Sequence, residues 1–468
     1  MFWLAIHFPA LPLEIYSRGG AAPEPIAVIE RKGNRSWVKA CNAAAGAGGV
    51  QPGMQGSAAQ ALMANLIVRG SDLASEQESL VGLAAWAGAY TPDVSLQPPD
   101  GLLIEIGSCL RLHRGFNNLI SKMRNGLNEM GYTSSFACAP TPHAAWLMAL
   151  AGRQVAIRES GKLEKALGEL PVSVLDQSQD TLSSLEMVGA HTLGDCMQLP
   201  RAGMARRFGQ SLLDEMDRAL GRLPEVREYF LPPPSFERRL ELPSLVHESE
   251  ALLFAARHLL LELEGYLNLR QAGVQEFELV CHHEGVPETV VKVGFAQPTR
   301  TLERMLLLLR ETLGRTRLYA PVHTIVLRAS RIQEIEMANL DLFQDGAEAG
   351  DGNLLLERLR IRLGKEAVFS VAPAADHRPE LAWRTCEAGE ECKTVGKPQR
   401  PIWLLPKPMP CQKERLELQS GPERIESGWW DGRDVVRDYY VALGRNGSRL
   451  WVFRDRSSGG WFVHGLFA

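Results

Sequence analysis

Asp100 is the residue whose type and position first suggest chemistry in this chain. It follows a Pro-rich turn and precedes a short apolar strand expected near residues 102–106. Carboxylates at such strand ends can hold a pair of Mg²⁺ ions roughly 4 Å apart for phosphoryl transfer, but several carboxylates must converge on them. Another apolar strand is expected near residues 2–8, yet residues 1–13 contain no acidic side chain. A single Asp cannot build this site, so the sequence indicates that the chemistry is absent.

Several segments, in order along the chain, carry a resemblance to a known family. They are Trp3-Leu4-Ala5-Ile6-His7-Phe8-Pro9, Tyr90-Thr91-Pro92, Asp100-Gly101-Leu102-Leu103, Leu199-Pro200-Arg201-Ala202-Gly203, the stretch from Gly421 to Asp431, Arg437-Asp438-Tyr439-Tyr440 and the final Trp461-Phe462-Val463-His464-Gly465-Leu466-Phe467. In this order they resemble the Y-family translesion DNA polymerases, and more closely the ImuB-type branch of bacterial mutagenic repair cassettes. The resemblance covers nearly the whole chain, and the order of the pieces is hard to obtain by chance.

The resemblance implies which metal ligands are missing. The family pattern Asp-Glu-Ala-Tyr-Leu-Asp places its first Asp on Asp100 and its catalytic Glu on Gly101. The N-terminal strand of the family carries a metal-binding Asp, whereas here Ala5 and His7 stand in that strand. We therefore expect no catalytic residues, and Asp100 is the one carboxylate of the family pattern that remains.

The resemblance also implies that the nucleotide grip is lost. Family members hold the triphosphate with the Tyr and Arg of a Cys-Asn-Tyr-Pro-Ala-Arg-type segment, and here these positions are Ala43 and Gly46. A guanidinium suits phosphate, and glycine offers only its backbone. The phosphate-binding Lys of the family falls near Trp146. We therefore expect no nucleotide site.

The implied function is a non-catalytic scaffold of translesion DNA synthesis in the DNA-damage (SOS) response. The expected partners are the β sliding clamp, an error-prone C-family DNA polymerase, an ImuA-type RecA-like protein, and DNA bound without sequence preference. No cofactor and no metal are expected. Two alternatives stay open: an active Y-family polymerase with a degenerate metal site and, more remotely, a DNA-binding repair factor without a clamp contact.

Composition bounds these expectations. Among the 468 residues, 45% are hydrophobic and 23% are charged, which is ordinary for a globular protein. The net charge of −4 gives no overall nucleic-acid signature, so DNA contacts must come from local basic patches. Eight dispersed Cys and no recognisable signal peptide or membrane span favour a reducing cytoplasm.

Zinc binding is not expected from the Cys and His residues. Cys281, His282 and His283 are neighbours on one expected strand, where side chains alternate between faces. Cys386, Cys392 and Cys411 near His377 lack the short knuckle spacing of zinc ligands.

The predicted fold class is α+β and multidomain, with a C-terminal β-rich extension. By resemblance, residues 1–165 form an inactive palm and fingers, residues 166–230 a helical thumb with a helix-hairpin-helix-like element, and residues 236–338 an α/β little finger. Residues 232–234 are three prolines, a semi-rigid linker. The expected order after this linker is strand, helix, strand, strand, helix, strand. Residues 347–468 form an interaction region with an amphipathic helix and a β-rich end.

DNA contacts are assigned to five arginines. A three-Arg cluster lies in the thumb-like segment, and two more lie at the start of the little-finger-like segment; the five are Arg201, Arg206, Arg207, Arg238 and Arg239. Guanidinium contacts to phosphate dominate non-specific DNA affinity. A solvated basic face without a ligand is the alternative.

Residues 339–346 contain a clamp-binding-like segment. Asn339-Leu340-Asp341-Leu342-Phe343 resembles the bacterial clamp-binding pentapeptide Gln-Leu-x-Leu-Phe, with Asn in place of Gln. Leu342 and Phe343 are suitable anchors, since a few buried side chains carry most interface energy. A helix end or core strand is the alternative reading of this short apolar segment.

Six of the ten Trp lie in the last hundred residues. Trp403 and Trp451 are expected in a small aromatic core. Trp429 and Trp430, beside Asp431-Gly432, are expected at a contact surface, where Trp is enriched.

Overall fold

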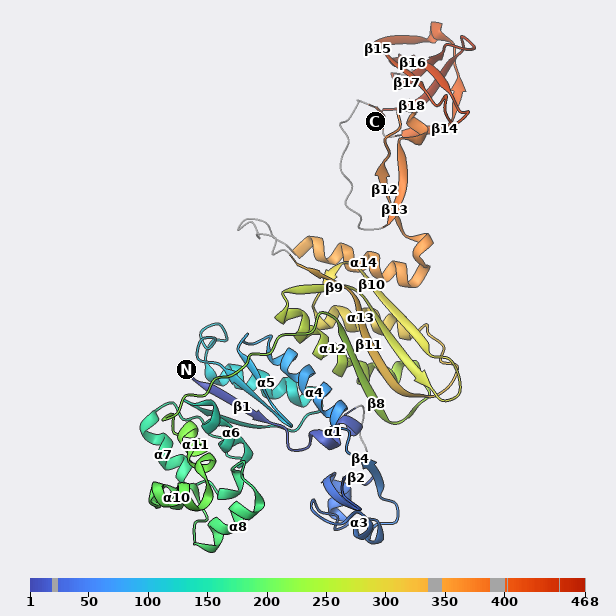
Figure 1. The fold of residues 1–468 in the computed structure, drawn as a ribbon. Helices are drawn as coiled ribbons and strands as arrows, with labels where there is room; N and C mark the ends of the chain where they lie inside the picture. Colours follow the sequence, from blue (N-terminus) through green and yellow to red (C-terminus); the bar gives the residue numbers. More distant parts are fainter. Residues whose placement is uncertain (19–23, 336–346, 388–399, 402, 446, 468) are drawn as a thin grey trace. The chain divides into compact units, whose positions relative to one another are not determined.

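The computed structural model describes residues 1–18, 24–335, 347–387, 400–401, 403–445 and 447–467. The chain divides into two compact units, Met1–Gly346 and Ala347–Ala468 (Figure 1). Mixed helices and strands fill the first unit, and the second unit is mostly strands. The predicted α+β class with a β-rich C-terminal part is therefore confirmed. None of the helices in the described part of the chain combines the length and apolarity that a membrane span needs.

A four-stranded antiparallel sheet lies at the centre of the N-terminal region. Its order is β5-β6-β1-β7, with β1 at Trp3–His7, β5 at Val94–Gln97, β6 at Gly101–Glu105 and β7 at Ser135–Ala139. Helix α6 (Pro142–Leu150) packs on the face that carries Trp3 and Ala5. Helices α1 (Leu11–Ser17), α4 (Leu73–Ala87) and α5 (Phe116–Glu129) complete this part, with α4 contacting β5 and β6.

A smaller three-stranded sheet, of order β3-β2-β4, is inserted after α1. Its strands are β2 (Ile26–Lys32), β3 (Arg35–Cys41) and β4 (Ile67–Gly70). Short helices α2 (Ala43–Ala47) and α3 (Gly56–Leu62) accompany it. Asn42 begins α2 as its N-cap, since its side chain accepts a hydrogen bond from the backbone N–H of Ala45.

Five helices follow α6: α7 (Ser160–Gly168), α8 (Gln179–Met187), α9 (Leu193–Gln198), α10 (Arg201–Phe208) and α11 (Gln210–Ala219). Their apolar faces continue the core cluster that begins at α6, through buried residues such as Leu167, Leu185 and Leu212. Helix α9 starts with a capping box in which Thr192 and Asp195 satisfy each other's backbone N–H groups.

The segment from 236 to 334 has the strand and helix order expected from the sequence, which is confirmed. Its elements are β8 (Phe236–Val246), α12 (Leu252–Leu269), β9 (Ala272–His283), β10 (Thr289–Thr299), α13 (Leu302–Leu313) and β11 (Val322–Glu334). The sheet order is β10-β9-β11-β8, all antiparallel. Helix α12 contacts β8, β9 and β11, and α13 contacts β10, so one face of the sheet is covered.

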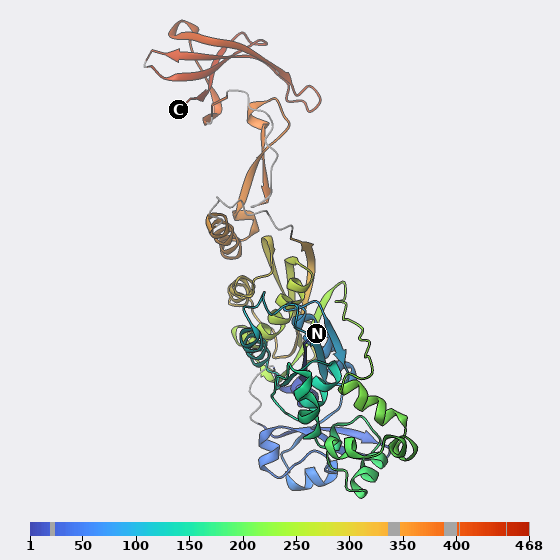
Figure 2. The same ribbon diagram turned by 90° about the vertical axis from the view of Figure 1, so that its left-hand side faces the viewer.

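The second unit contains α14 (Ala347–Leu363), a β12–β13 pair (Phe369–Pro373 and Trp383–Glu387) and a five-stranded sheet. The order of that sheet is β14-β18-β17-β16-β15, the orange and red arrows of Figure 2. Its strands are β14 (Trp403–Pro410), β15 (Leu416–Ser427), β16 (Val435–Gly444), β17 (Arg449–Asp455) and β18 (Trp461–Leu466). Tyr439 stacks on buried Trp451 with ring centroids 4.1 Å apart.

The expectation for Trp451 as a core residue is confirmed, and that for Trp403 is wrong. Trp403 begins the edge strand β14 and is 68% exposed. Trp429 and Trp430 are both largely exposed, as expected, and lie edge to face. Buried Arg378 holds this turn by contacts to Asp431 and by stacking over Trp430.

Candidate functional site

The residues aligned with the polymerase metal site lie at one end of the central sheet. Strand β1 pairs with β6 so that His7 lies opposite Gly101 and Ala5 opposite Leu103. Asp100 immediately precedes β6, and its carbonyl accepts a hydrogen bond of 2.8 Å from Phe8 N–H. The structure therefore brings His7, Asp100 and Gly101 together, as the sequence alignment requires.

His7 is the polar neighbour of Asp100. Its Nε2 lies 3.5 Å from Asp100 Oδ2, and both side chains are partly exposed. Ala5, two residues earlier on the same face, is fully buried in the apolar cluster under α6. Asp100 thus faces an imidazole and an apolar surface where metal chemistry would need further carboxylates.

Trp146 fills the space beside this position. Its indole is 7% exposed and meets His7 edge to face, with ring centroids 5.6 Å apart. A Cβ on Gly101 would lie 2.2 Å from Cζ3 and 2.3 Å from Cη2 of this indole. The glycine and the tryptophan are therefore sterically coupled: a side chain at 101 does not fit while Trp146 is in place.

Glu105, the last residue of β6, is an acidic residue that was not among those predicted from the sequence. Its carboxylate accepts hydrogen bonds from Phe2 N–H (2.9 Å), Gly107 N–H (3.1 Å) and the Ser108 backbone and hydroxyl. Burial alone would raise the pKa of this carboxyl, but the hydrogen bonds outweigh burial and lower it. Glu105 is thus occupied in fixing the chain at one end of the β1–β6 pair, where β1 begins and β6 ends, opposite to the end that carries His7 and Gly101.

Ala43 and Gly46, aligned with the nucleotide grip, are exposed on the short helix α2. A Cβ on Gly46 would meet no atom within 4 Å, so this surface is open and uncharged. Nothing at these two positions could neutralise a triphosphate.

The Cys and His residues considered above for zinc do not gather in a metal site among the described residues. No group of three His, Cys, Asp or Glu among them is arranged to hold an ion. His282 faces Glu288, while His283 contacts Thr289 and the Pro321 carbonyl. Burial raises the pKa of the Cys281 thiol to about 12, which disfavours the thiolate that metals bind. Cys392 lies outside the described residues.

The five arginines assigned to DNA have different surroundings. Arg201 makes a two-pronged ion pair with Asp217, at 3.0 and 2.5 Å. Arg206 and Arg207 are exposed in the last turn of α10, and no acidic partner lies within ion-pair distance among the described residues. Among the five arginines assigned to DNA, Arg206 and Arg207 are therefore the two whose positive charge is least neutralised by acidic side chains.

Arg238 and Arg239 are adjacent on β8 and therefore point to opposite faces. Arg238 is 13% exposed and directed at Glu262, with Nε and Oε2 3.5 Å apart. Arg239 is exposed and lies 3.5 Å from Glu241. On the uncovered sheet face, Lys292 pairs with Glu278 at 2.6 Å and Arg328 with Glu237 at 3.2 Å. This face is close to charge-balanced, which weakens its attraction for phosphate.

The clamp-binding-like segment, Asn339 to Phe343, lies outside the described residues. It falls between the end of β11 at Glu334 and the start of α14 at Ala347. Its assignment stays a prediction from the sequence.

Comparison with known proteins gives two kinds of match. Residues 21–149 match the model of the impB/mucB/samB family. ImuB proteins from two strains of Caulobacter vibrioides are each 27% identical over 456 residues, covering 90% of this chain and all of theirs.

Solved structures of Y-family polymerases are also similar. A Dbh–Dpo4 chimera covers 71% of this chain and 99% of its own, at 17% identity and a TM-score of 0.40. DinB from Sulfolobus solfataricus covers the same shares at 16% identity and a TM-score of 0.38. The chain is thus similar to ImuB proteins over 90% of its length, and the impB/mucB/samB match lies within its N-terminal region.

Proposed function

We propose that this chain is a non-catalytic scaffold of translesion DNA synthesis that links the β sliding clamp, DNA, an error-prone C-family polymerase and an ImuA-type partner. Its similarity to ImuB and its impB/mucB/samB domain support a role in the DNA-damage response. The partners themselves come from the family resemblance.

One observation carries the non-catalytic part of the proposal. Trp146 occupies the volume that a side chain at position 101 would need, and the aligned position in β1 is the buried Ala5. Two-metal phosphoryl transfer requires converging carboxylates. Here Asp100 faces the His7 imidazole, and among the described residues no group of three His, Cys, Asp or Glu is arranged to hold an ion.

The proposed binding to DNA and to the clamp depends on residues that lie outside the Asp100 site. Arg206 and Arg207 offer unneutralised charge for DNA phosphates without any sequence readout. The Asn339–Phe343 peptide offers Leu342 and Phe343 as anchors for an apolar pocket on the clamp. A scaffold needs these contacts and does not need Asp100.

A cell-based experiment separates scaffold from enzyme. In a strain whose own copy is deleted, damage-induced mutagenesis is measured with wild-type chain, Asp100→Ala, or Leu342→Ala with Phe343→Ala. A scaffold predicts that Asp100→Ala supports normal mutagenesis, while the double variant abolishes it at equal protein level. Loss of mutagenesis with Asp100→Ala would instead favour the alternative, an active polymerase with a degenerate metal site.

A further inference from the structure

Helices α4 and α12 approach each other closely, although they lie in parts of the chain separated by the whole helical segment. A Cβ on Gly265 would lie 2.6 Å from Cα of Trp86, and one on Gly82 would lie 2.7 Å from Oε2 of Glu262. Glycine at 265 therefore permits close approach of the helix backbones, and glycine at 82 leaves room for the Glu262 carboxylate. The segment from 236 to 335 is seated on the N-terminal region through this contact.

Glu262 is the centre of a buried ion network in this contact. Its Oε1 accepts a hydrogen bond of 2.6 Å from Nη1 of Arg18, which directly follows α1, and the two side chains are 1% and 3% exposed. Arg238 of β8 approaches the other carboxylate oxygen at 3.5 Å. The Arg18 guanidinium also lies over the Tyr132 ring, 4.8 Å from its centroid. Three elements of distant sequence therefore share one carboxylate.

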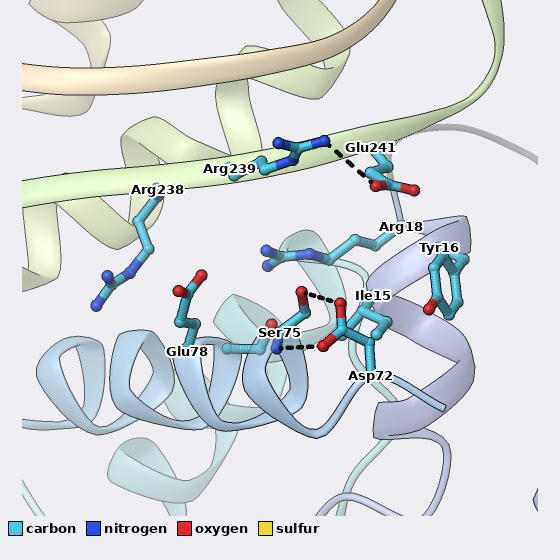
Figure 3. A pocket seen from close by; sticks show the side chains of 10 residues that line it. Ile15, Tyr16, Arg18, Asp72, Ser75, Glu78, Arg238, Arg239 and Glu241 are labelled. Atoms are coloured by element: carbon cyan, nitrogen blue, oxygen red, sulfur yellow. Dashed lines mark hydrogen bonds and ion pairs between the residues drawn. The ribbon is translucent and has the colours of Figure 1, made fainter. Parts of the chain in front are cut away.

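Three polar atoms of the network have no hydrogen-bond partner among the described residues, although they are buried: Arg18 Nε, Arg238 Nε and Glu262 Oε2. The last two are in ion-pair contact at 3.5 Å. Arg18 and Arg238 also line a cavity of about 40 Å³ between α1, α4 and β8 (Figure 3). A buried charge without its partner is costly, so removing Glu262 would leave two guanidiniums facing each other.

The linker is held at both ends as well. Phe230 N–H donates to the Val94 carbonyl of β5 at 2.7 Å. Beyond it, Tyr266 OH of α12 donates to the Pro233 carbonyl, and Nη1 of Arg270, which directly follows α12, donates to the Pro234 carbonyl, each at 2.8 Å. Any hinge motion between the N-terminal region and the 236–335 segment would have to occur in this linker. The linker is thus hydrogen-bonded to both of the parts that it joins.

We propose that the Arg18–Glu262–Arg238 network locks the 236–335 segment onto the N-terminal region, so that the two parts move as one body in the free protein. The lock requires the carboxylate of Glu262, because it is the acidic group that both guanidiniums contact. The proposal concerns motion alone and holds whether or not the chain extends primers.

The test measures the distance between the two parts by pulsed electron resonance. Spin labels are placed on Asn117→Cys and Glu284→Cys, both exposed positions, after replacement of the accessible native cysteines by serine. The full chain is expected to give one narrow distance peak. Glu262→Gln, which keeps the shape and removes the charge, is expected to broaden that peak or add a second one.

Glu129→Gln is the matched control. It breaks the exposed Arg257–Glu129 ion pair, which spans the same two parts at 2.6 Å, and is expected to leave the peak unchanged. A broad peak in the unsubstituted chain, or an unchanged peak in Glu262→Gln, overturns the proposal. If Glu262→Gln does not fold, Arg18→Gln, which removes the guanidinium that the N-terminal region contributes, is measured in its place and judged by the same two results.

Discussion

The indole of Trp146 and the backbone of Gly101 occupy adjoining space so closely that a Cβ at 101 would lie 2.2 Å from Cζ3 of the ring. His7, opposite Gly101 on β1, also meets this indole, edge to face. The position aligned with a catalytic Glu is thus closed by a side chain from α6.

The first prediction concerns this steric coupling. Gly101→Ala is expected to lower the free energy of unfolding by roughly 1–3 kcal/mol, because an added methyl overpacks the contact with Trp146. Trp146→Leu in the same chain should recover part of that loss. Urea denaturation of both single variants and the double variant measures the coupling.

Gly46→Ala is the control for this series, because a Cβ there meets no atom within 4 Å. It should leave stability unchanged or raise it by a few tenths of a kcal/mol, roughly the effect expected in a helix. Additive effects of Gly101→Ala and Trp146→Leu would show that the two residues are not in contact.

The second prediction concerns pH. Burial lowers the pKa of His258 from 6.5 to about 4, with Arg18 and Arg257 adding to the shift and Glu262 opposing it. Between those pH values the unfolded chain binds the proton and the folded chain does not. The free energy of unfolding should therefore fall as pH falls from about 6.5 to 4, by roughly 3 kcal/mol from this residue.

His258→Leu should remove that part of the pH dependence, which denaturation at a series of pH values measures. His247→Leu serves as the control, since its side chain is exposed. An identical pH profile for His258→Leu and the unsubstituted chain would mean that His258 takes up its proton equally easily in both states.

The third prediction concerns DNA. Replacing Arg206 and Arg207 with Ala should weaken binding to any duplex and reduce the slope of log K against log salt by roughly 1.8, since each phosphate contact contributes roughly 0.9. Arg201→Ala should change the slope little, because Asp217 already neutralises this guanidinium. Fluorescence anisotropy at several salt concentrations gives both slopes. Equal effects of the two changes would place Arg201 on the DNA as well.

The fourth prediction concerns the clamp. Leu342→Ala with Phe343→Ala should abolish capture by the β sliding clamp, because each lost anchor removes roughly 1.5–3 kcal/mol of apolar burial. Asn339→Gln should strengthen capture, since the longer amide restores the family's polar contact. Circular dichroism should be unchanged in all variants. Unfolding of the double variant would show that the segment belongs to the core and not to an interface.

The elements of the 236–334 segment could be predicted because each has a strong apolar period between clear turn signals. The partners of its charged residues could not. Arg238 was assigned to DNA by its charge, yet the structure directs it at Glu262, 24 positions further along, because β8 and α12 fold against each other.

The burial of the aromatic residues could not be predicted from the local sequence either. Trp403 and Trp451 both stand in apolar strands, but β14 lies at the sheet edge and β17 lies between two strands. Strand position in a sheet depends on pairing between distant segments, which a local pattern does not contain. Likewise, the sequence placed Trp146 at a lost Lys, and only packing reveals that it closes the position beside Gly101.

Primer extension by the purified full chain tests the central claim most directly. A primed template is incubated with all four deoxynucleotides and either Mg²⁺ or Mn²⁺, with Asp100→Ala and an active Y-family polymerase measured in parallel. The missing carboxylates predict no extension by the chain with either metal, and no difference between it and Asp100→Ala. Template-dependent extension that Asp100→Ala abolishes would contradict the account.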